Sequence, residues 1–332
     1  MTHLTEPSKP VRISIAPERE PPLTDREKLA AYLGLSLQTE SPRSGYPLLA
    51  PLSFVRRMTP GDLNDPLLRQ VLPDAAEDRT VAGFSSDPVG DDAATAPEGF
   101  LQKYAGRALL PVTSACALHC RFCFRRNRPS ERYLSDPEML DRAVTALSRR
   151  TDIHEIILSG GDPLMLPADI LERLLWELSR MSHITRVRIH TRMPIAAPAR
   201  VNGVLMGVLA SCGKPLVAVV HTNHPNELND ETSAALGRIS DRAAALLNQS
   251  VLLRGVNDSA EVLSELSEKL FAQGVLPYYL HQLDRAHGTA HFEVPEEEGV
   301  RIVQKLRTRS PGWLVPRYVR ETPGEPCKTA LL

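Results

Sequence analysis

From about residue 108 onward, short apolar runs alternate along the chain with amphipathic stretches of about a dozen residues. Strand–helix alternation of this kind predicts βαβ units around a parallel sheet, and near-continuous apolar strands indicate a sheet that is covered on its outer face. We expect six strands, at 108–115, 155–160, 185–192, 215–222, 245–253 and 276–283, with helices between them at 137–149, 168–181, 231–244 and 260–273.

Six units within residues 108–283 are too few for a complete eight-unit barrel, which typically takes about 250 residues. The pattern alone is compatible with a partial barrel that is open on one side and with a flat, doubly wound sheet. Both arrangements place active-site residues at the carboxyl ends of the strands.

The segments on either side of this α/β unit differ from it in composition. Thirteen of the 28 prolines lie in the first hundred residues, which show little sustained periodicity. We interpret 1–107 as an irregular, partly helical extension wrapped on the core, with helical stretches near 25–33 and 67–72 and about 20 disordered residues at its start. We place the α/β unit at 108–295, and a C-terminal helix and tail at 296–332.

The charge balance excludes some classes of partner. With 39 basic and 40 acidic side chains, the formal net charge is −1, whereas a nucleic-acid-binding surface needs clustered excess Lys and Arg. The start of the chain has no apolar core of the signal-peptide type, and no run approaches about 18 apolar residues. We therefore expect a cytoplasmic protein that binds neither nucleic acid nor membrane.

The chemistry is indicated most strongly by the cysteines, of which three of the five, Cys116, Cys120 and Cys123, follow the first expected strand within eight positions. Such clustering with an odd total indicates a metal site or catalysis rather than disulfides. Three thiolates on one loop can each ligate one iron of a cube-shaped cluster and leave the fourth iron open to a reactive ligand. The alternative is a zinc site in which His119 or a distant histidine is the fourth ligand.

This cysteine spacing, after the first strand of a six-unit pattern, resembles the radical S-adenosylmethionine superfamily. The resemblance implies that the open iron chelates S-adenosylmethionine, whose cleavage by an electron from the cluster gives a 5′-deoxyadenosyl radical. The superfamily also has a glycine-rich turn after its second strand, which here is Ser159-Gly160-Gly161-Asp162. Paired glycines let the backbone approach a ligand closely.

The carboxyl-terminal motif GEPCKT, which contains Lys328, is more specific. Together with the cysteine cluster it is similar to the lysine 2,3-aminomutase family, in which this lysine holds pyridoxal 5′-phosphate as a Schiff base. The family resemblance covers roughly residues 50–330 and is close at 119–126, 159–164, 221–227, 248–258, 277–292 and 313–329. It implies a partial (β/α)6 barrel of the radical S-adenosylmethionine type, with the irregular extension before it and a short C-terminal segment after it.

The resemblance implies roles for single residues. A substrate carboxylate needs a fork-shaped cation, and the family position is Arg125. The ε-ammonium of a lysine substrate needs carboxylates in an apolar pocket, and the two family positions are Asp284 and Glu321, where the fermentative relatives carry Asp in place of Glu321. The cofactor-binding positions are implied to be Lys103 and Arg107 for the phosphate, the turn Ser159–Asp162 for the amino group of S-adenosylmethionine, and His221 and Gln249 for its adenosine.

The implied reaction moves the α-amino group of L-lysine to C3 and gives β-lysine, with three cofactors: a [4Fe–4S] cluster, S-adenosylmethionine and pyridoxal phosphate. An external electron donor of the flavodoxin or ferredoxin type is implied. The segments FVRRM, DPLLRQVLP and GFSSDPV, and the end of the chain four residues after Lys328, resemble the short branch that makes β-lysine for elongation factor P. In that branch a lysyl-tRNA synthetase-like ligase is a functional partner.

Two alternatives stay open. The same chemistry could act on another amino acid, glutamate or arginine. A non-enzymatic iron–sulfur or zinc protein that senses iron or redox state is the alternative from another class, but it leaves Arg125, Asp284, Glu321 and Lys328 without a role.

Overall fold

The computed structural model describes residues 20–37, 41–43 and 45–332. Its centre is one sheet in which the strands follow each other in chain order from β1 to β8. Neighbouring strands from β1 to β7 are parallel, and β8 is antiparallel to β7. The strands are β1 (Arg107–Thr113), β2 (Glu155–Gly160), β3 (Arg186–Thr191), β4 (Leu216–His221), β5 (Ala245–Val251), β6 (Leu276–His281), β7 (Arg317–Arg320) and β8 (Thr329–Ala330).

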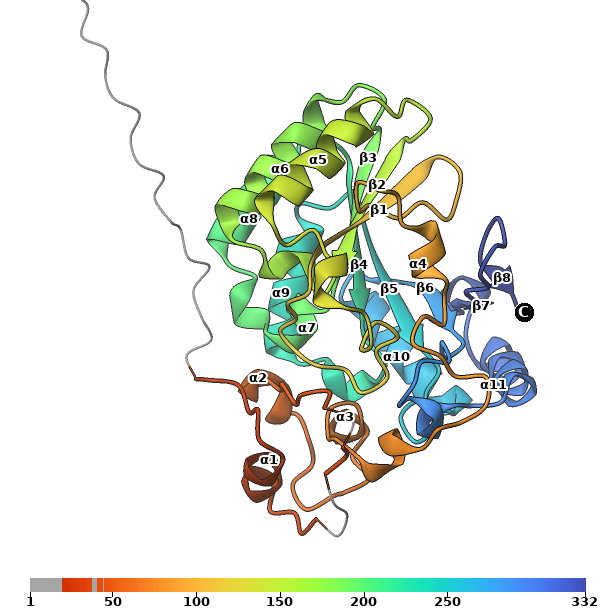
Figure 1. Ribbon diagram of the computed structural model, residues 1–332. Coiled ribbons are helices and arrows are strands. Elements are labelled where there is room, and N and C mark those ends of the chain that lie inside the picture. Colours follow the sequence, from red (N-terminus) through yellow and green to blue (C-terminus); the bar gives the residue numbers. More distant parts are fainter. Residues whose placement is uncertain (1–19, 38–40, 44) are drawn as a thin grey trace, which may run out of the picture.

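The crossover helices form an outer layer along this sheet (Figure 1). The α-helices of the whole chain as described are α1 (Arg26–Leu33), α2 (Leu52–Val55), α3 (Pro66–Arg69), α4 (Asp91–Ala94), α5 (Pro137–Ser148), α6 (Ala168–Arg180), α7 (Met193–Ala196), α8 (Gly203–Ala210), α9 (Asp230–Ser240), α10 (Ala260–Ala272) and α11 (Glu296–Arg309). The predicted partial barrel is confirmed, since parallel strands in sequential order are joined by helices that cover one face.

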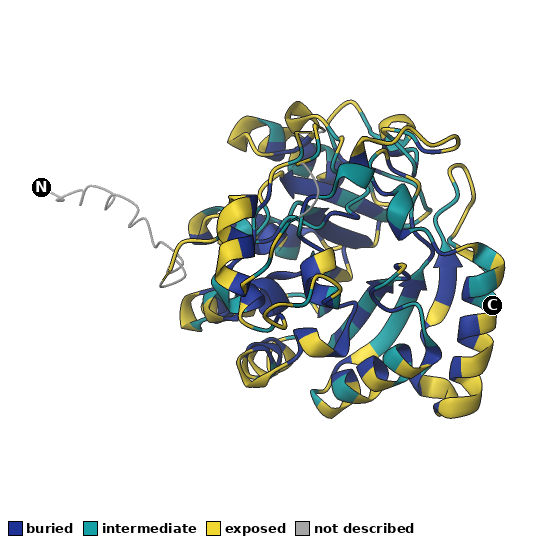
Figure 2. Ribbon diagram, turned by 90° about the horizontal axis from the view of Figure 1, so that it is seen from below, coloured by how far each residue is buried: buried dark blue, intermediate teal, exposed yellow. Residues whose placement is uncertain are grey.

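The helices bury the faces that their apolar spacing predicts. In α6 the buried residues are Leu171, Leu174, Leu175 and Leu178, which the 3.6-residue period places on one side. Figure 2 shows the result, with exposed residues on the outward faces of the helices and buried residues facing the sheet. Burial of each such leucine contributes about 1.5–3 kcal/mol.

The carboxyl-terminal segment contains more than the expected helix and tail. After α11 the chain adds β7 beside β6, with Tyr279 opposite Arg317, and then returns as β8. The sheet therefore continues past the six predicted strands, and the β7–β8 hairpin carries the end of the chain back to the inner face.

The amino-terminal extension packs against the loop that follows β1. The backbone N–H of His119 donates to the carbonyl of Leu49 (2.9 Å), and that of Arg121 donates to the carbonyl of Gln70 (2.8 Å). Helices α1 and α3 lie close to the expected helical stretches, and both begin at an Asp N-cap, Asp25 and Asp65. The predicted disorder of the first 20 or so residues falls almost wholly outside the described residues.

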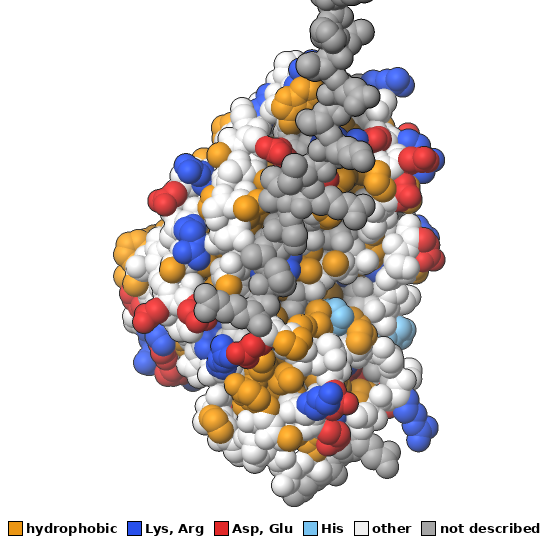
Figure 3. All heavy atoms as spheres, turned by 90° about the vertical axis from the view of Figure 1, so that its left-hand side faces the viewer, with side chains coloured by type: hydrophobic (Ala, Val, Ile, Leu, Met, Phe, Trp, Pro, Cys, Tyr) orange, Lys and Arg blue, Asp and Glu red, His pale blue; other side chains and the backbone are white. Residues whose placement is uncertain are grey.

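The surface carries charges of both signs. On the face shown in Figure 3, acidic and basic side chains are interspersed, and neither sign forms a continuous patch. Within the described residues, no helix has both the length and the apolar character that crossing a membrane requires.

Candidate active site

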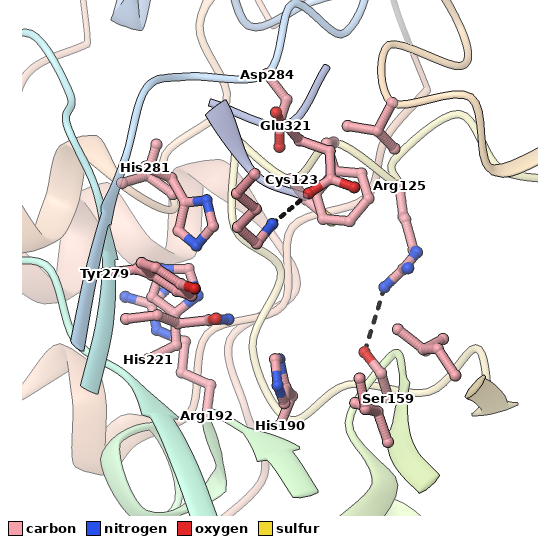
Figure 4. A pocket seen from close by; sticks show the side chains of 18 of the residues that line it. Cys123, Arg125, Ser159, His190, Arg192, His221, Tyr279, His281, Asp284 and Glu321 are labelled. Carbon is pink, nitrogen blue, oxygen red and sulfur yellow. Dashed lines mark hydrogen bonds and ion pairs between the residues drawn. The ribbon is translucent and has the colours of Figure 1, made fainter. Parts of the chain in front are cut away.

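A cavity of about 750 Å³ lies against the inner face of the sheet. Every residue for which the sequence predicted a binding or catalytic role lines it, although these residues come from segments more than 200 positions apart (Figure 4). They are Lys103, Arg107, Cys116, Cys120, Cys123, Arg125, Ser159, Gly160, Gly161, Asp162, His221, Gln249, Asp284, Glu321 and Lys328.

The three cysteines lie on the loop after β1 and are half-buried. Burial raises the pKa of all three thiols, that of Cys123 to about 11. These thiols therefore stay protonated near neutral pH unless a metal replaces the proton. A donor set of this kind, three soft sulfur ligands at one wall of a cavity, fits an iron–sulfur cluster.

His119, the candidate fourth ligand of the alternative zinc site, contacts the amino-terminal extension. The Nδ1 atom of His119 lies 3.1 Å from the carbonyl oxygen of Pro47, and its ring stacks on Tyr46 with centroids 5.3 Å apart. Among the described residues, no three His, Cys, Asp or Glu side chains converge on a point where one ion could bind. A cube-shaped cluster needs no such convergence, because each thiolate binds its own iron.

The cysteine loop is also tied down by ion pairs that the sequence analysis missed. Glu77, from the amino-terminal extension, accepts hydrogen bonds from both Arg121 and Arg126. Both arginines also face the ring of Tyr46, at 4.8 and 4.7 Å from its centroid. The partners are more than 40 positions apart, so no local pattern identifies them.

The glycine-rich turn after β2 fits closely against the cysteine loop. Gly160 has a φ of +125°, and a Cβ atom on Gly161 would lie 2.2 Å from the carbonyl oxygen of Ala115. The backbone N–H of Asp162 donates to the same carbonyl at 2.7 Å. Only glycine allows this approach, and it holds the turn directly beside the loop that carries the cysteines.

Within that turn, the carboxylate of Asp162 makes protein contacts rather than facing the cavity freely. It accepts hydrogen bonds from the hydroxyl of Thr191 (2.8 Å) and the backbone N–H groups of Arg192 (2.7 Å) and Leu164 (3.0 Å). The side chain therefore ties the end of β2 to the end of β3. Its backbone groups are also paired, since the N–H donates to the carbonyl of Ala115 and the carbonyl accepts from the N–H of Met165 at 2.9 Å.

At the other end of the cavity, the β7–β8 hairpin places Lys328 beside Glu321, and the two form an ion pair. The hydroxyl of Tyr104 donates to Glu321 at 2.7 Å, and Lys103 Nζ lies 3.5 Å from it. Although burial opposes ionisation, Lys328 and these neighbours hold the pKa of Glu321 below its usual value.

Asp284 follows β6 and has a different environment. No described group donates a hydrogen bond to its carboxylate, and burial raises its pKa to about 7. Asp284 therefore has no hydrogen-bonded partner among the described groups, although the charges of Lys328 and Lys103 favour its ionised form. A carboxylate in this environment fits a group that binds a cation.

Arg125 is oriented by an acidic residue that the sequence analysis did not single out. Its Nε atom lies 3.0 Å from Asp91 Oδ2, and its NH1 atom donates to the hydroxyl of Ser159 at 3.3 Å. Lys103 Nζ lies 2.7 Å from the other Asp91 oxygen. Burial opposes ionisation of Asp91, but the two cations hold its pKa at about 2. The buried carboxylate of Asp91 thus orients both Arg125, predicted to bind the substrate carboxylate, and Lys103, predicted to bind the cofactor phosphate.

Cationic groups also gather near the amino ends of β1 and β3. Arg107 stacks over the ring of Tyr104, with its Cζ atom 4.9 Å from the centroid. Arg188, which the sequence analysis missed, pairs with Glu155 at 2.5 Å and has a buried Nε–H with no partner among the described groups. An orphaned guanidinium donor that lines a cavity fits an anionic group such as a phosphate.

His221 and Gln249 are paired neighbours at the ends of β4 and β5. Burial lowers the pKa of His221 to about 3, so its imidazole is neutral. The ring of Phe122 lies 5.6 Å away. These groups form a mixed aromatic and hydrogen-bonding wall beside the cysteine loop.

Comparisons with known proteins identify the family of the chain. Residues 110–263 match the family model described as the Radical SAM superfamily. The chain is 39% identical to the L-lysine 2,3-aminomutase of Escherichia coli strain K12, over 100% of this chain and 98% of that protein. It is 41% identical to the enzyme of the same name from Buchnera aphidicola, over 85% and 83% of the two chains, and 39% identical to that from Haemophilus influenzae, over 88% and 86%.

This identity along the whole length of both chains makes the protein a member of the L-lysine 2,3-aminomutase family, isomerases of the radical S-adenosylmethionine superfamily whose membership implies an iron–sulfur cluster, S-adenosylmethionine and pyridoxal phosphate as cofactors.

Proposed function

We propose that the protein converts L-lysine to β-lysine by moving the α-amino group to C3, with pyridoxal phosphate bound at Lys328. The observation that carries the proposal is the pair of carboxylates that line the cavity with Lys328: Asp284 has no hydrogen-bond donor among the described groups, and Glu321 already binds an ammonium. The names of the relatives support the same substrate.

The carboxylate pair selects among amino acids by charge. The ε-ammonium of lysine would be neutralised by Asp284 and Glu321, whereas the γ-carboxylate of glutamate would meet two negative charges in a buried site. A guanidinium is larger and planar and would need a fork-shaped arrangement of acceptors. We therefore favour lysine over glutamate and arginine.

The substrate carboxylate is assigned to Arg125. Asp91 and Ser159 fix the direction of the guanidinium before the substrate arrives. Preorganisation of this kind reduces the entropy lost on binding and holds the β-carbon at a constant position relative to the cysteine loop.

Pyridoxal phosphate fits the cavity through Lys328 for its aldehyde and through Lys103 and Arg107, with the orphaned donor of Arg188, for its phosphate. Cys116, Cys120 and Cys123 would hold the cluster, and the glycine turn with His221 and Gln249 would hold S-adenosylmethionine. When bound, the cluster and S-adenosylmethionine supply a carbon-centred radical, and pyridoxal phosphate supplies a π-system that stabilises the migrating nitrogen.

The chain's own residues contribute orientation and exclusion of water rather than acid–base chemistry. His190, His221 and His281 line the cavity, and burial lowers the pKa of each, so that they are neutral at physiological pH. Neutral side chains at this wall put no exchanging charge beside a radical, which limits side reactions there.

We further propose that the protein works in the cytoplasm with an electron donor of the flavodoxin or ferredoxin type, and that its β-lysine is used by a lysyl-tRNA synthetase-like ligase to modify elongation factor P. The full-length similarity to the Escherichia coli enzyme supports this branch of the family. Incubation of elongation factor P with the ligase and the product of this enzyme, followed by mass spectrometry, tests the link. An unmodified factor would exclude it.

The substrate assignment is tested by anaerobic incubation with reductant, S-adenosylmethionine, pyridoxal phosphate and, in separate reactions, L-lysine, L-glutamate or L-arginine. We expect a β-amino acid from lysine alone, and no product from any substrate with Cys116→Ala. Turnover of glutamate or arginine at a rate equal to that of lysine would refute the assignment.

A further inference from the structure

Arg192, directly after β3, has no role in the chemistry proposed above, yet its side chain reaches the cysteine loop. The guanidinium is buried, with 8% of the residue exposed. Its NH1 atom donates to Cys120 Sγ at 2.7 Å, and Arg192 lines the same cavity as His221 (Figure 4). The charge of this arginine is therefore directed at one of the three candidate cluster ligands.

Two fully buried side chains fix the other edge of the guanidinium. Its NH2 atom donates to Glu227 Oε2 at 2.9 Å and to Gln70 Oε1 at 2.6 Å. Gln70 also donates to Glu227 at 3.1 Å, and the backbone N–H of Asn223 donates to the same carboxylate at 2.9 Å. Because these partners are themselves held, the guanidinium cannot turn away from Cys120 without breaking several buried hydrogen bonds.

The two edges of the Arg192 guanidinium bind groups of different kinds. Glu227 binds the NH2 side of the guanidinium, and Cys120 binds the NH1 side. The positive charge therefore lies between the carboxylate and the sulfur. A positive charge and a hydrogen bond at a ligand sulfur stabilise the more negative, reduced state of an iron–sulfur cluster, and burial strengthens the effect.

We propose that Arg192 is a positioning residue that donates a hydrogen bond to the Cys120 sulfur and raises the reduction potential of the cluster. In the step concerned, a low-potential flavodoxin or ferredoxin loses one electron and the cluster gains it, from the 2+ to the 1+ state. Arg192 keeps its proton throughout. The inference rests on the proposed function only in that Cys120 is a ligand of the cluster.

The test is a redox titration of the anaerobically reconstituted protein, without S-adenosylmethionine, in which electron paramagnetic resonance follows the reduced cluster. Arg192→Gln removes the charge, and we expect a midpoint potential more negative than that of the wild type. Arg192→Lys keeps the charge but loses the fork, so its potential should lie between the two. Glu227→Gln removes the opposing charge while keeping the shape, and its potential should shift in the opposite direction, to a more positive value.

Arg57 provides a control, because it lies near Glu227 and Ile195 and its described hydrogen bonds go to backbone carbonyls. Its guanidinium donates to the backbone carbonyls of Glu227 and Ile195. Arg57→Gln removes a half-buried arginine that braces the same region, and we expect it to lower the melting temperature while leaving the midpoint potential unchanged.

Opposite shifts in Arg192→Gln and Glu227→Gln would support the inference, because a merely structural role predicts no such difference in sign. A full cluster with the wild-type potential in Arg192→Gln would overturn it. If Arg192→Gln retains no cluster, the midpoint potentials of Arg192→Lys and Glu227→Gln provide the test. Wild-type potentials in both of these variants would overturn the inference. Loss of S-adenosylmethionine binding at an unchanged potential would also overturn it and would assign Arg192 to that cofactor. A wild-type protein that takes up no cluster would instead refute the proposed function.

Discussion

The ammonium of Lys328 forms an ion pair with the carboxylate of Glu321, seven residues earlier in the chain. The β7–β8 hairpin produces this contact, because Thr329 pairs with Arg320 and so brings the residues next to them together. Lys328 thus pairs with Glu321, the carboxylate that the family resemblance implies for the substrate ammonium. Attachment of a cofactor to Lys328 would free Glu321 for the substrate.

Lys328 is the proposed attachment site of pyridoxal phosphate. Lys328→Ala should abolish covalent attachment of pyridoxal phosphate, detected by mass spectrometry after borohydride reduction. Lys103, which also lies near Glu321 at 3.5 Å, is held by Asp91 at 2.7 Å and should not replace it. Cys327→Ser, at the exposed neighbouring position, should be labelled as efficiently as the wild type. A reduced adduct at a different lysine in the wild type would contradict the assignment.

Asp284 should make lysine binding depend on pH. Burial raises its pKa to about 7, and only the ionised carboxylate attracts an ammonium, so affinity should rise with pH and level off above the pKa. At about pH 6 roughly one tenth of the sites are ionised, which predicts a Kd about tenfold weaker than at pH 8.

Asp284→Asn should bind lysine weakly at both pH values and show no such step. Glu321 does not cause the step, because its pKa lies below its usual value and it stays ionised over this range. Calorimetric titration of lysine at pH 6 and pH 8 measures the Kd of the wild type and of Asp284→Asn. A step of the same size in Asp284→Asn would place the titrating group elsewhere.

Gly161→Ala should destabilise the protein by about 2–3 kcal/mol, since its Cβ would overlap the carbonyl of Ala115, a rigid backbone group. Gly207, in the exposed face of α8, is the matched control, because a Cβ there meets nothing within 4 Å. Gly207→Ala should stabilise by about 0.5–1 kcal/mol. Equal midpoints of urea unfolding for the two variants would argue against the close contact between the turn and the cysteine loop.

Asp91→Asn should raise the KM for lysine about tenfold, because Arg125 loses the charged partner that orients it, and a lost charge-assisted hydrogen bond costs about 1.5 kcal/mol. Asp92, its exposed neighbour, lies 3.6 Å from Arg132 and serves as the control. Asp92→Asn should have the wild-type KM. A wild-type KM in Asp91→Asn would show that Arg125 is oriented without Asp91.

The six strands were predictable because each is a short run rich in apolar and β-branched residues between longer amphipathic stretches. All six predicted strands are found with ends within two residues of the expected ones. Strand β7 was missed because its sequence, RYVR, is short and half charged, and only pairing with β6 makes it a strand. Helix α8 was missed because Gly203 and Gly207 have low helix propensity.

Within the site, the residues that could be predicted belong to local sequence motifs, and the missed ones depend on partners far away in the sequence. The cysteines, the glycine turn and the lysine motif are local patterns, and the structure brings them to one cavity. Asp91 and Arg192 were missed because their partners are 12 to 122 positions away. Their roles arise from the meeting of the amino-terminal extension with the barrel, which no local pattern encodes.

The central claim is that this cavity moves a nitrogen atom from C2 to C3 of lysine. The most direct test supplies the holoenzyme with L-lysine labelled with nitrogen-15 at the α-amino group and follows the label by nuclear magnetic resonance. The account predicts β-lysine that carries the label at C3, formed only when S-adenosylmethionine and reductant are both present. A protein that holds its cluster and pyridoxal phosphate, cleaves S-adenosylmethionine and yet leaves the label at C2 would contradict it.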